Sequence, residues 1–402
     1  MTSSIARVDD SLRHQRTLVR RHAKVVYLSP PQALPWVVMK YAIALAEGGA
    51  DVKVFSTLED ADTYDLGIVK GNVAFRRFRR NFYVPLVWRF PRLARLRVPL
   101  PTPALFSALL RERADIYIAG QPDDLPIVAT AARIVGGEIA YIPFEYYPGL
   151  SSGDQGTLAL YRRLEKKYSA RIRAWISLGD KLSEEYRRVY GLNETVHTIY
   201  SALPRHFQTP PVNLRQEIGA SKDWVLVLYQ GQVSKNRGLW DVLEALKQLP
   251  DFIHFVVLGG KDIELFRTDV DAAGLRHRVH IMPFVPQNVM MGYTLQADIG
   301  IICGHDVCLS YHYCNPGKLF EYIAAGLPVA VSDLPQLRWY VRTRKLGEVF
   351  TPGSAPEIAR AIKKLAENKA YRAACARASR DVHQSEACWE VQAEKLRAAI
   401  LR

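Results

Sequence analysis

The sequence has few cysteines, and none of them is arranged as a disulfide framework or a zinc site. The five cysteines include no Cys-x-x-Cys pair and no histidine at zinc-finger spacing. Cys303, Cys308 and Cys314 lie close together, but they flank an apolar run, which favours buried thiols over a metal site. We therefore expect reduced thiols, no bound metal and an intracellular location.

Long hydrophobic runs are also missing. No stretch approaches the roughly 18 consecutive apolar residues that read as a membrane-spanning helix. Residues 1–22 lack the apolar core of a secretory signal peptide. These absences predict a cytoplasmic protein that is not integral to a membrane, although they leave contact with a membrane surface open.

Acidic residues are scarce relative to basic ones. The 402 residues include 54 Lys and Arg but 40 Asp and Glu, which gives a formal net charge of +14. Such a balance favours an anionic partner, whether nucleic acid, an anionic lipid surface or a phosphorylated substrate. Between Leu66 and Arg111 acidic residues are absent altogether. The basic residues of this segment are Lys70, Arg76, Arg77, Arg79, Arg80, Arg89, Arg92, Arg95, Arg97 and Arg111.

Aromatic residues are interleaved with these cations. Phe75, Phe78 and Phe82 recur at i, i+3 and i+7, which predicts one helical face with three rings. Basic residues with interleaved rings are typical of a surface segment on anionic lipid. We therefore expect Arg76, Arg77, Arg79 and Arg80 to hold the protein on the inner face of a membrane. The alternative is that the rings belong to the core and the arginines form a solvated face.

The length and the pattern of apolar runs predict two domains. A chain of this size exceeds what one core usually supports, and short apolar strands alternate with helical stretches, which indicates parallel sheets covered by helices. We expect an α/β fold with two doubly wound, Rossmann-like domains facing a central cleft. The predicted segments are an N-terminal extension at 1–23, a first Rossmann-like domain at 24–204, a linker at 205–222, a second Rossmann-like domain at 223–384 and a C-terminal segment at 385–402.

The predicted strands place the ligand. They cover residues 24–29, 51–57, 115–120, 138–144 and 173–179 in the first half, and 224–231, 254–260, 279–285, 298–304 and 328–333 in the second. In open α/β sheets the ligand binds beyond the carboxyl ends of the strands. A site between the two halves is the expectation.

The segment NPGKLFEYIAAGLPVAVSD (315–333) carries the most information about chemistry. Asn315 as N-cap and Pro316 near the first helical position predict a helix start, and Gly326 predicts its end. The free amides of a helix N-terminus attract an anion, and Lys318 adds a positive charge there. Glu321 lies one turn further in, where a carboxylate can accept hydrogen bonds from sugar hydroxyls. The plain alternative is a capped helix with a surface glutamate.

The run PGKLFEYIAAGLPV followed by SDLP closely resembles the signature of the family 4 retaining glycosyltransferases of the GT-B fold. The resemblance implies that Gly317 and Lys318 lie at the donor site and that Glu321 holds the ribose hydroxyls of a nucleotide sugar. A second family glutamate, eight positions earlier, falls on Tyr313 in this sequence. The usual contact with the donor sugar therefore has a different residue here.

A second stretch, YQGQVSKNRGLWDVLEA (229–245), resembles the diphosphate-binding loop of the same family. Gly231 after a buried strand permits close backbone approach, and nearby cations suit a diphosphate. Where the family has Arg and Lys, this sequence has Gln232 and Arg237. The resemblance implies that Arg237 grips the diphosphate with help from Lys235.

Looser similarities extend over the remainder of the chain. By resemblance, the backbone around Phe284 and Val285 reads the nucleobase, and Asp123 and Glu145 stand at the acceptor-side loops. A carboxylate at a strand end in a cleft can act as an acid, a base or a hydroxyl ligand. Loop solvation or a local salt bridge is the alternative for both. The resemblance makes 24–204 the acceptor-side domain and 223–384 the nucleotide-sugar-binding domain. Residues 385–402 resemble the family's C-terminal helix that crosses back to the first domain, and Trp389 and Leu396 in it are expected to pack.

Together the resemblance implies a retaining hexosyltransferase that uses a UDP- or GDP-linked sugar and no cofactor. Its acceptor would be lipid-linked or a saccharide, in the synthesis of a bacterial polysaccharide or glycolipid. A sugar-nucleotide epimerase or an inactive GT-B relative stays open because of Tyr313 and Gln232. A nucleic-acid-binding protein is a third hypothesis, with Phe82, Tyr83, Trp88 and Phe90 stacking on bases. It leaves Glu321 unexplained, so we expect no nucleic-acid partner.

Overall fold

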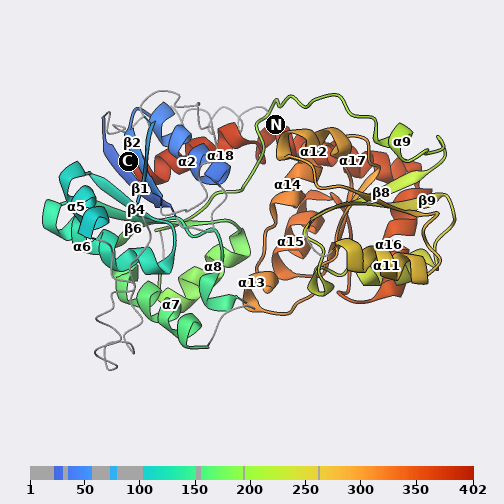
Figure 1. The fold of residues 1–402 in the computed structure, drawn as a ribbon, viewed down its shortest axis with the longest axis horizontal. Coiled ribbons are helices and arrows are strands. Elements are labelled where there is room, and N and C mark those ends of the chain that lie inside the picture. Colours follow the sequence, from blue (N-terminus) through green and yellow to red (C-terminus); the bar gives the residue numbers. More distant parts are fainter. Residues whose placement is uncertain are drawn as a thin grey trace, which may run out of the picture.

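The computed structural model describes residues 22–29, 35–56, 73–78, 103–150, 155–192, 195–260 and 263–402. They form two α/β lobes that lie side by side (Figure 1). Each lobe is built around its own parallel sheet. The chain crosses from the first lobe to the second after β7.

The first lobe contains a seven-stranded sheet in the order β3-β2-β1-β4-β5-β6-β7. Its strands are β1 (Lys24–Ser29), β2 (Asp51–Ser56), β3 (Val73–Arg77), β4 (Ile116–Ala119), β5 (Glu138–Tyr141), β6 (Ile172–Ser177) and β7 (Val196–Thr198). Its helices are α2 (Pro35–Glu47), α5 (Pro103–Glu112), α6 (Leu125–Val135), α7 (Gln155–Tyr168) and α8 (Asp180–Tyr190), with short 3-10 turns η2 (Pro122–Asp124), η3 (Tyr147–Gly149) and η4 (Ser169–Arg171).

The second lobe contains a six-stranded sheet in the order β10-β9-β8-β11-β12-β13. Its strands are β8 (Val225–Gly231), β9 (Ile253–Gly259), β10 (Val279–Met282), β11 (Ile299–Ile302), β12 (Val329–Ser332) and β13 (Gly347–Phe350). Its helices are α9 (Leu214–Glu217), α10 (Leu239–Leu246), α11 (Ile263–Ala272), α12 (Gln287–Thr294), α13 (Leu309–His312), α14 (Gly317–Ala324), α15 (Pro335–Arg344), α16 (Ala355–Glu367) and α17 (Lys369–Ser385), with one 3-10 turn, η5 (Lys235–Arg237).

Hydrophobic cores lie on both faces of each sheet. In the first lobe, one core packs α5, α6, α7 and α8 against the sheet, and the other packs α2. In the second lobe, α10, α11 and α16 cover one face, while α14 and α15 cover the other. Strands buried on both faces need continuous apolar runs, which is why the sequence located most of them. The predicted α/β class with two doubly wound domains is confirmed.

Helix α18 (Trp389–Leu401) lies on the first lobe although it follows the second in sequence (Figure 1). Its residue Leu396 is fully buried in the same core as α2. The ring of Trp389 contacts Tyr41 of α2, with centroids 5.4 Å apart. Both side chains therefore pack, as the sequence indicated.

The helical face predicted for Phe75, Phe78 and Phe82 is wrong where the structure describes it. Residues 73–77 form β3, an edge strand paired in parallel with β2. Phe78 is buried, with its ring 4.9 Å from that of Phe55. The i, i+3 spacing cannot distinguish a helix from the end of a strand over so few residues. Arg79, Arg80 and Phe82 lie outside the described residues.

Two predicted absences can be compared with the structure. In the described part of the chain, no helix is both long enough and apolar enough to cross a membrane. All five cysteines are free, and Cys303, Cys375 and Cys388 are buried.

Candidate functional site

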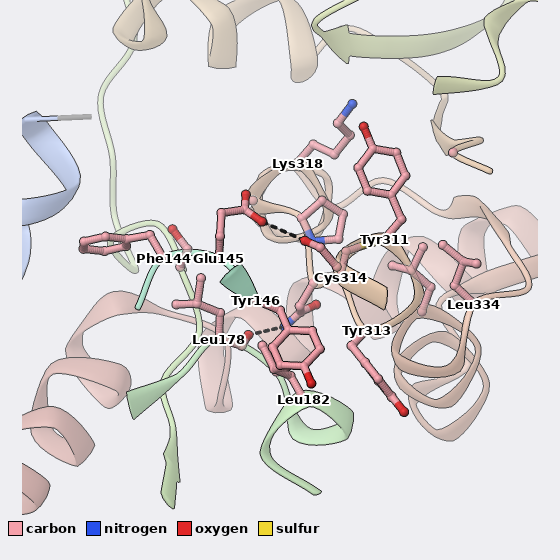
Figure 2. A pocket seen from close by; sticks show the side chains of 18 of the residues that line it. Phe144, Glu145, Tyr146, Leu178, Leu182, Tyr311, Tyr313, Cys314, Lys318 and Leu334 are labelled. Atoms are coloured by element: carbon pink, nitrogen blue, oxygen red, sulfur yellow. Dashed lines mark hydrogen bonds between the residues drawn. The ribbon is translucent and has the colours of Figure 1, made fainter. Parts of the chain in front are cut away.

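A cleft of about 840 Å³ lies between the two lobes. The first lobe contributes residues that follow β5 and β6, and the second contributes residues that follow β8 and β11. These are carboxyl ends of parallel strands, where α/β proteins bind their ligands. Figure 2 shows Glu145 of the first lobe and Lys318 of the second projecting into this pocket.

The N-terminus of α14 opens on the cleft. Pro316 is the N-cap, with extended backbone, and Gly317 begins the helix. The prediction that Asn315 caps this helix is wrong. Its side-chain amide instead donates to the carbonyl oxygen of Leu178 in the first lobe at 2.8 Å. Asn315 therefore ties the lobes together and leaves the first amides of α14 for a ligand.

Lys318 lies at this helix N-terminus and folds over the end of β8. Its Nζ is 3.9 Å from the centre of the Tyr229 ring. A Cβ on Gly231 would lie 3.2 Å from that Nζ, and Gly231 has φ of +124°, so both space and backbone favour glycine. Burial, with a smaller effect of the positive charge of Arg237, lowers the pKa of Lys318 to about 8. An anion bound beside such a buried lysine stabilises its charged form.

Arg237 reaches the cleft from η5. Its guanidinium lies 4.9 Å from the centre of the Tyr311 ring. The next residue, Gly238, has φ of +72°, and a Cβ there would lie 1.8 Å from the carbonyl oxygen of Cys303. Only glycine fits, so the backbone that aims Arg237 is fixed by close packing against the residue after β11. Arg237 and Lys318 thus flank one space from two loops of the second lobe.

Glu321 lies one turn into α14 and is held by a residue that the sequence reading missed. The side-chain amide of Gln230, a buried residue of β8, donates to Glu321 Oε2. Gln230 Oε1 in turn accepts from the hydroxyl of Thr294 at 2.9 Å. Burial raises the pKa of Glu321, while Gln230, Lys318 and Lys40 oppose the rise. The sequence could have indicated Gln230, because it is a polar residue within the apolar run VLVLYQG.

Lys40 is a second residue missed from sequence. It lies on α2, where its Nζ donates to the carbonyl oxygen of Ala202 and sits 4.1 Å from the centre of the Trp389 ring. Burial lowers its pKa to about 7, and the carboxylates of Glu321 and Glu390 partly offset the change. In the sequence Lys40 interrupts an apolar helix pattern, which marks a lysine with an unusual setting.

Glu145 enters the cleft from the loop after β5. Its Oε2 accepts a hydrogen bond from Ser310 Oγ of α13 at 2.9 Å. Glu145 is exposed to the cleft, yet the surrounding protein removes enough bulk water to raise its pKa. The hydrogen bond from Ser310 and the charge of Arg237 oppose that rise. The Glu145 side chain therefore connects the loop after a first-lobe strand to a second-lobe helix.

Tyr313 lines the cleft but directs its hydroxyl to the first lobe. That hydroxyl donates to Glu185 Oε2 of α8 at 3.3 Å. Its ring lies edge to face with Tyr146, with centroids 6.2 Å apart. Among the described residues that line the cleft, the carboxylates are Glu145 and Glu321.

The structure brings Glu145, Arg237, Tyr313, Gly317, Lys318 and Glu321 together at the cleft. Neither Asp123 nor its neighbour Asp124 lines it, and Asp124 is buried in η2. Lys235 points elsewhere, with its Nζ 3.4 Å from Asp269 and 3.8 Å from the centre of the Trp240 ring.

The predicted base-reading pair also lies outside the lining of this cleft. Phe284 is 79% exposed, and Val285 packs partly against the second-lobe core. Of the described residues, no three His, Cys, Asp or Glu side chains gather closely enough to hold a metal ion. The arrangement is a cleft with cations and helix amides on one side and a carboxylate from each lobe.

Known proteins match both the second lobe and the whole fold. Residues 213–382 match the family model described as glycosyl transferases group 1. The D-inositol 3-phosphate glycosyltransferase of Xylanimonas cellulosilytica is 25% identical over 242 residues, covering 56% of this chain and 54% of that relative. The chain thus spans about half the length of this curated relative.

Two solved structures share the architecture of both lobes. HepE from Anabaena, in complex with UDP and glucose, superposes with a TM-score of 0.71 at 17% identity, covering 93% of this chain and 98% of that one. Sucrose-phosphate synthase from Thermosynechococcus elongatus superposes with a TM-score of 0.72 at 17% identity, covering 93% and 97%. At such identities the likeness establishes the fold, which is GT-B.

Proposed function

We propose that the protein transfers a sugar from a nucleoside diphosphate sugar to an acceptor hydroxyl, with retention at the anomeric carbon. The observation that carries this proposal is the convergence of Arg237, Lys318 and the α14 N-terminus on one space beside Glu321. Two cations and free helix amides suit a diphosphate, and a buried carboxylate suits the ribose hydroxyls. The family match covers these residues of the second lobe.

The second lobe would stabilise the leaving group. As the bond between the anomeric carbon and the diphosphate breaks, negative charge grows on the diphosphate oxygens. Arg237, Lys318 and the α14 amides are already oriented toward that charge, so little reorganisation is needed. Such positive groups perform here the role that a metal ion performs in other transferases. We propose a UDP- or GDP-linked hexose as donor and no cofactor.

The first lobe would position the acceptor. Glu145 faces the donor side of the cleft from the opposite lobe, and its raised pKa makes it a better base than a free carboxylate. Its role is to accept the hydrogen bond of the attacking hydroxyl. Tyr313 occupies the position of the usual sugar-contacting glutamate, so Glu145 is also the available carboxylate for the donor sugar.

Melting curves with UDP, GDP, dTDP and ADP test the proposal. A nucleotide at a hundred times its dissociation constant stabilises the folded protein by ~2.7 kcal/mol. One nucleoside diphosphate should raise the melting temperature clearly, and Lys318→Met should reduce that rise. A flat response to all four would overturn the assignment.

A sugar-nucleotide epimerase is the second candidate, and the orientation of Tyr313 favours it. With its hydroxyl on Glu185, Tyr313 leaves the sugar with one carboxylate fewer than the family pattern provides. An epimerase would convert the nucleotide sugar without an acceptor, and an inactive relative would bind it unchanged. Proton NMR of the sugar, with and without acceptors, separates these outcomes from transfer.

We further propose that the protein works at the inner face of a membrane, in the synthesis of a cell-surface polysaccharide or glycolipid. The support is the basic segment from Leu66 to Arg111, in which Arg76 is exposed while Phe75 lies in β3 and Phe78, just after it, is buried. Attachment would therefore be electrostatic, through arginines rather than inserted rings.

A further inference from the structure

The first-lobe wall of the cleft offers few charges. Of the described residues that line this wall, Lys40 and Glu145 are the charged ones. Lys40 is engaged at the donor end, where its Nζ donates to the Ala202 carbonyl and faces Glu321. Among the described residues of this wall, Glu145 is therefore the one titratable carboxyl group offered to an acceptor.

The rest of that wall carries no charged side chain among the described residues and is built from apolar side chains, tyrosines and a few hydroxyl groups. Its largely apolar part, which we call the apolar branch, consists of Tyr146, Tyr147, Leu150, Leu158, Leu178 and Leu182. Leu334 and Leu337 face it from α15 of the second lobe. Figure 2 shows Tyr146, Leu178 and Leu182 on the side of Glu145 away from Lys318. The cleft thus changes from cationic to apolar across Glu145.

Such a wall discriminates between acceptors. A saccharide carries hydroxyls on every edge, and each hydroxyl buried against leucine without a partner weakens binding. An aliphatic group gains affinity on the same surface in proportion to the apolar area it covers. Besides Lys40 and Glu145, the polar side-chain groups of the described residues on this wall are the hydroxyls of Thr157, Ser201 and three tyrosines, Tyr146, Tyr147 and Tyr161.

We propose that the acceptor is a lipid alcohol, whose reactive hydroxyl is carried directly by an apolar body. The hydroxyl meets Glu145 and the aliphatic part fills the apolar branch. This inference rests on the proposed function. The acceptor oxygen bonds to the anomeric carbon on the same face that the diphosphate leaves, as retention requires, while the carbon–diphosphate bond breaks. The diphosphate leaves with that electron pair, and Glu145 takes the hydroxyl proton.

The test compares two acceptors with the full chain and the nucleotide sugar whose diphosphate raises the melting temperature. The probes are 1,2-dioctanoylglycerol and maltose. We expect transfer to dioctanoylglycerol with a kcat/KM at least ten times that for maltose. A tenfold ratio corresponds to about the free energy gained by burying one leucine side chain. Equal or faster transfer to maltose overturns the lipid-alcohol inference and leaves glycosyl transfer standing.

Two substitutions locate the effect. Leu150 and Leu178 are only partly buried, so Leu150→Asn and Leu178→Asn should fold. Each should lower kcat/KM for dioctanoylglycerol about tenfold without changing the donor KM. The matched control is Leu265→Asn on α11, where the leucine is 52% exposed and far from the cleft lining. Unchanged dioctanoylglycerol kinetics in both cleft variants would overturn the inference. Failure of every nucleotide to bind would overturn the proposed function and the inference together.

Discussion

The carboxylate of Glu145 in the first lobe accepts a hydrogen bond of 2.9 Å from the hydroxyl of Ser310 in the second. The contact spans the cleft and joins the strand end after β5 to α13. It also lowers the pKa of Glu145 against the effect of the surrounding protein. The position and the proton affinity of this carboxylate therefore depend on both lobes.

Removing the hydroxyl of Ser310 should affect turnover more than donor binding. Ser310→Ala loses a hydrogen bond to a charged group, so we expect kcat to fall about tenfold with the donor KM unchanged. Because Ser310 lowers the pKa of Glu145, the acid limb of the pH–rate profile should move to higher pH. Ser310→Thr keeps the hydroxyl and should restore both. An equal loss in donor affinity would contradict this role.

Glu321→Ala should weaken the binding of the nucleotide. The lost charge-assisted hydrogen bonds are worth on the order of 1.5–3 kcal/mol, about ten- to a hundredfold in affinity. Gln230→Ala leaves the carboxylate in place but frees its rotation, so a smaller loss is expected. Titration calorimetry with the nucleoside diphosphate measures both. Wild-type affinity in a folded Glu321→Ala protein would remove the support for a ribose contact.

Arg237→Ala should lower kcat more than it raises the donor KM. The charge on the diphosphate grows in the transition state, so a cation that faces it acts mainly there. Arg237→Lys should recover part of the loss because lysine restores the charge without the planar fork. Steady-state kinetics over donor concentration separates the two parameters. If both variants match the wild type, Lys318 holds the diphosphate without Arg237.

Donor affinity should fall as the pH rises above about 8. Burial and Arg237 lower the pKa of Lys318 to about 8, so the free protein loses this positive charge there. The charged form binds the diphosphate, and the dissociation constant should rise by up to about tenfold per pH unit above that value. Lys318→Met should remove this dependence, whereas Lys247→Met, at an exposed position of the second lobe, should keep it. A dependence retained in Lys318→Met would assign the titration to another group.

The protein should float with anionic liposomes at low salt. Each arginine near such a surface contributes ~1 kcal/mol, so replacing Arg76, Arg77, Arg79 and Arg80 by Ser should release the protein. Binding should also fade as salt shortens the Debye length from about 10 Å at 0.1 M to about 3 Å at 1 M. Serine at Arg276, Lys363, Lys369 and Arg377, exposed residues of the second lobe, is the equal-charge control. A wild-type protein that stays unbound at low salt excludes membrane attachment by this segment.

The sequence predicted the position of the second-lobe site better than it predicted the contacts within that site. The run around Glu321 combines a helix start, a glycine stop and a strand, and such local signals survive folding. It did not predict the N-cap of α14 correctly, because the Asn315 side chain donates its hydrogen bond to Leu178, more than a hundred positions away. Similarly, Lys235 and Arg237 look alike in a basic loop, and only the turn of η5 separates the one at the cleft from the one at Asp269.

The first-lobe half of the site was harder to predict because its residues are common ones in apolar surroundings. The interruption of an apolar helix pattern marks Lys40 as unusual but does not assign it to a cleft, and no pattern distinguishes the leucines of the apolar branch from core leucines. Which face of a helix meets the other lobe depends on how the two sheets are placed, and no local pattern encodes that placement. The helix predicted at β3 is wrong for a separate, local reason: an edge strand of five residues shows too little alternation of apolar and polar residues to be recognised.

The position of α18 has a consequence for how the chain is made. Residues 389–401 complete the core that β1 and α2 begin, yet the ribosome adds them after the whole second lobe. Domains that emerge first commonly fold first during synthesis. Here the first lobe emerges early with α2 uncovered, and it waits for a helix encoded some 350 codons later. That apolar face of α2 therefore lacks its partner helix until translation ends, whereas the second-lobe residues are all synthesised before α18.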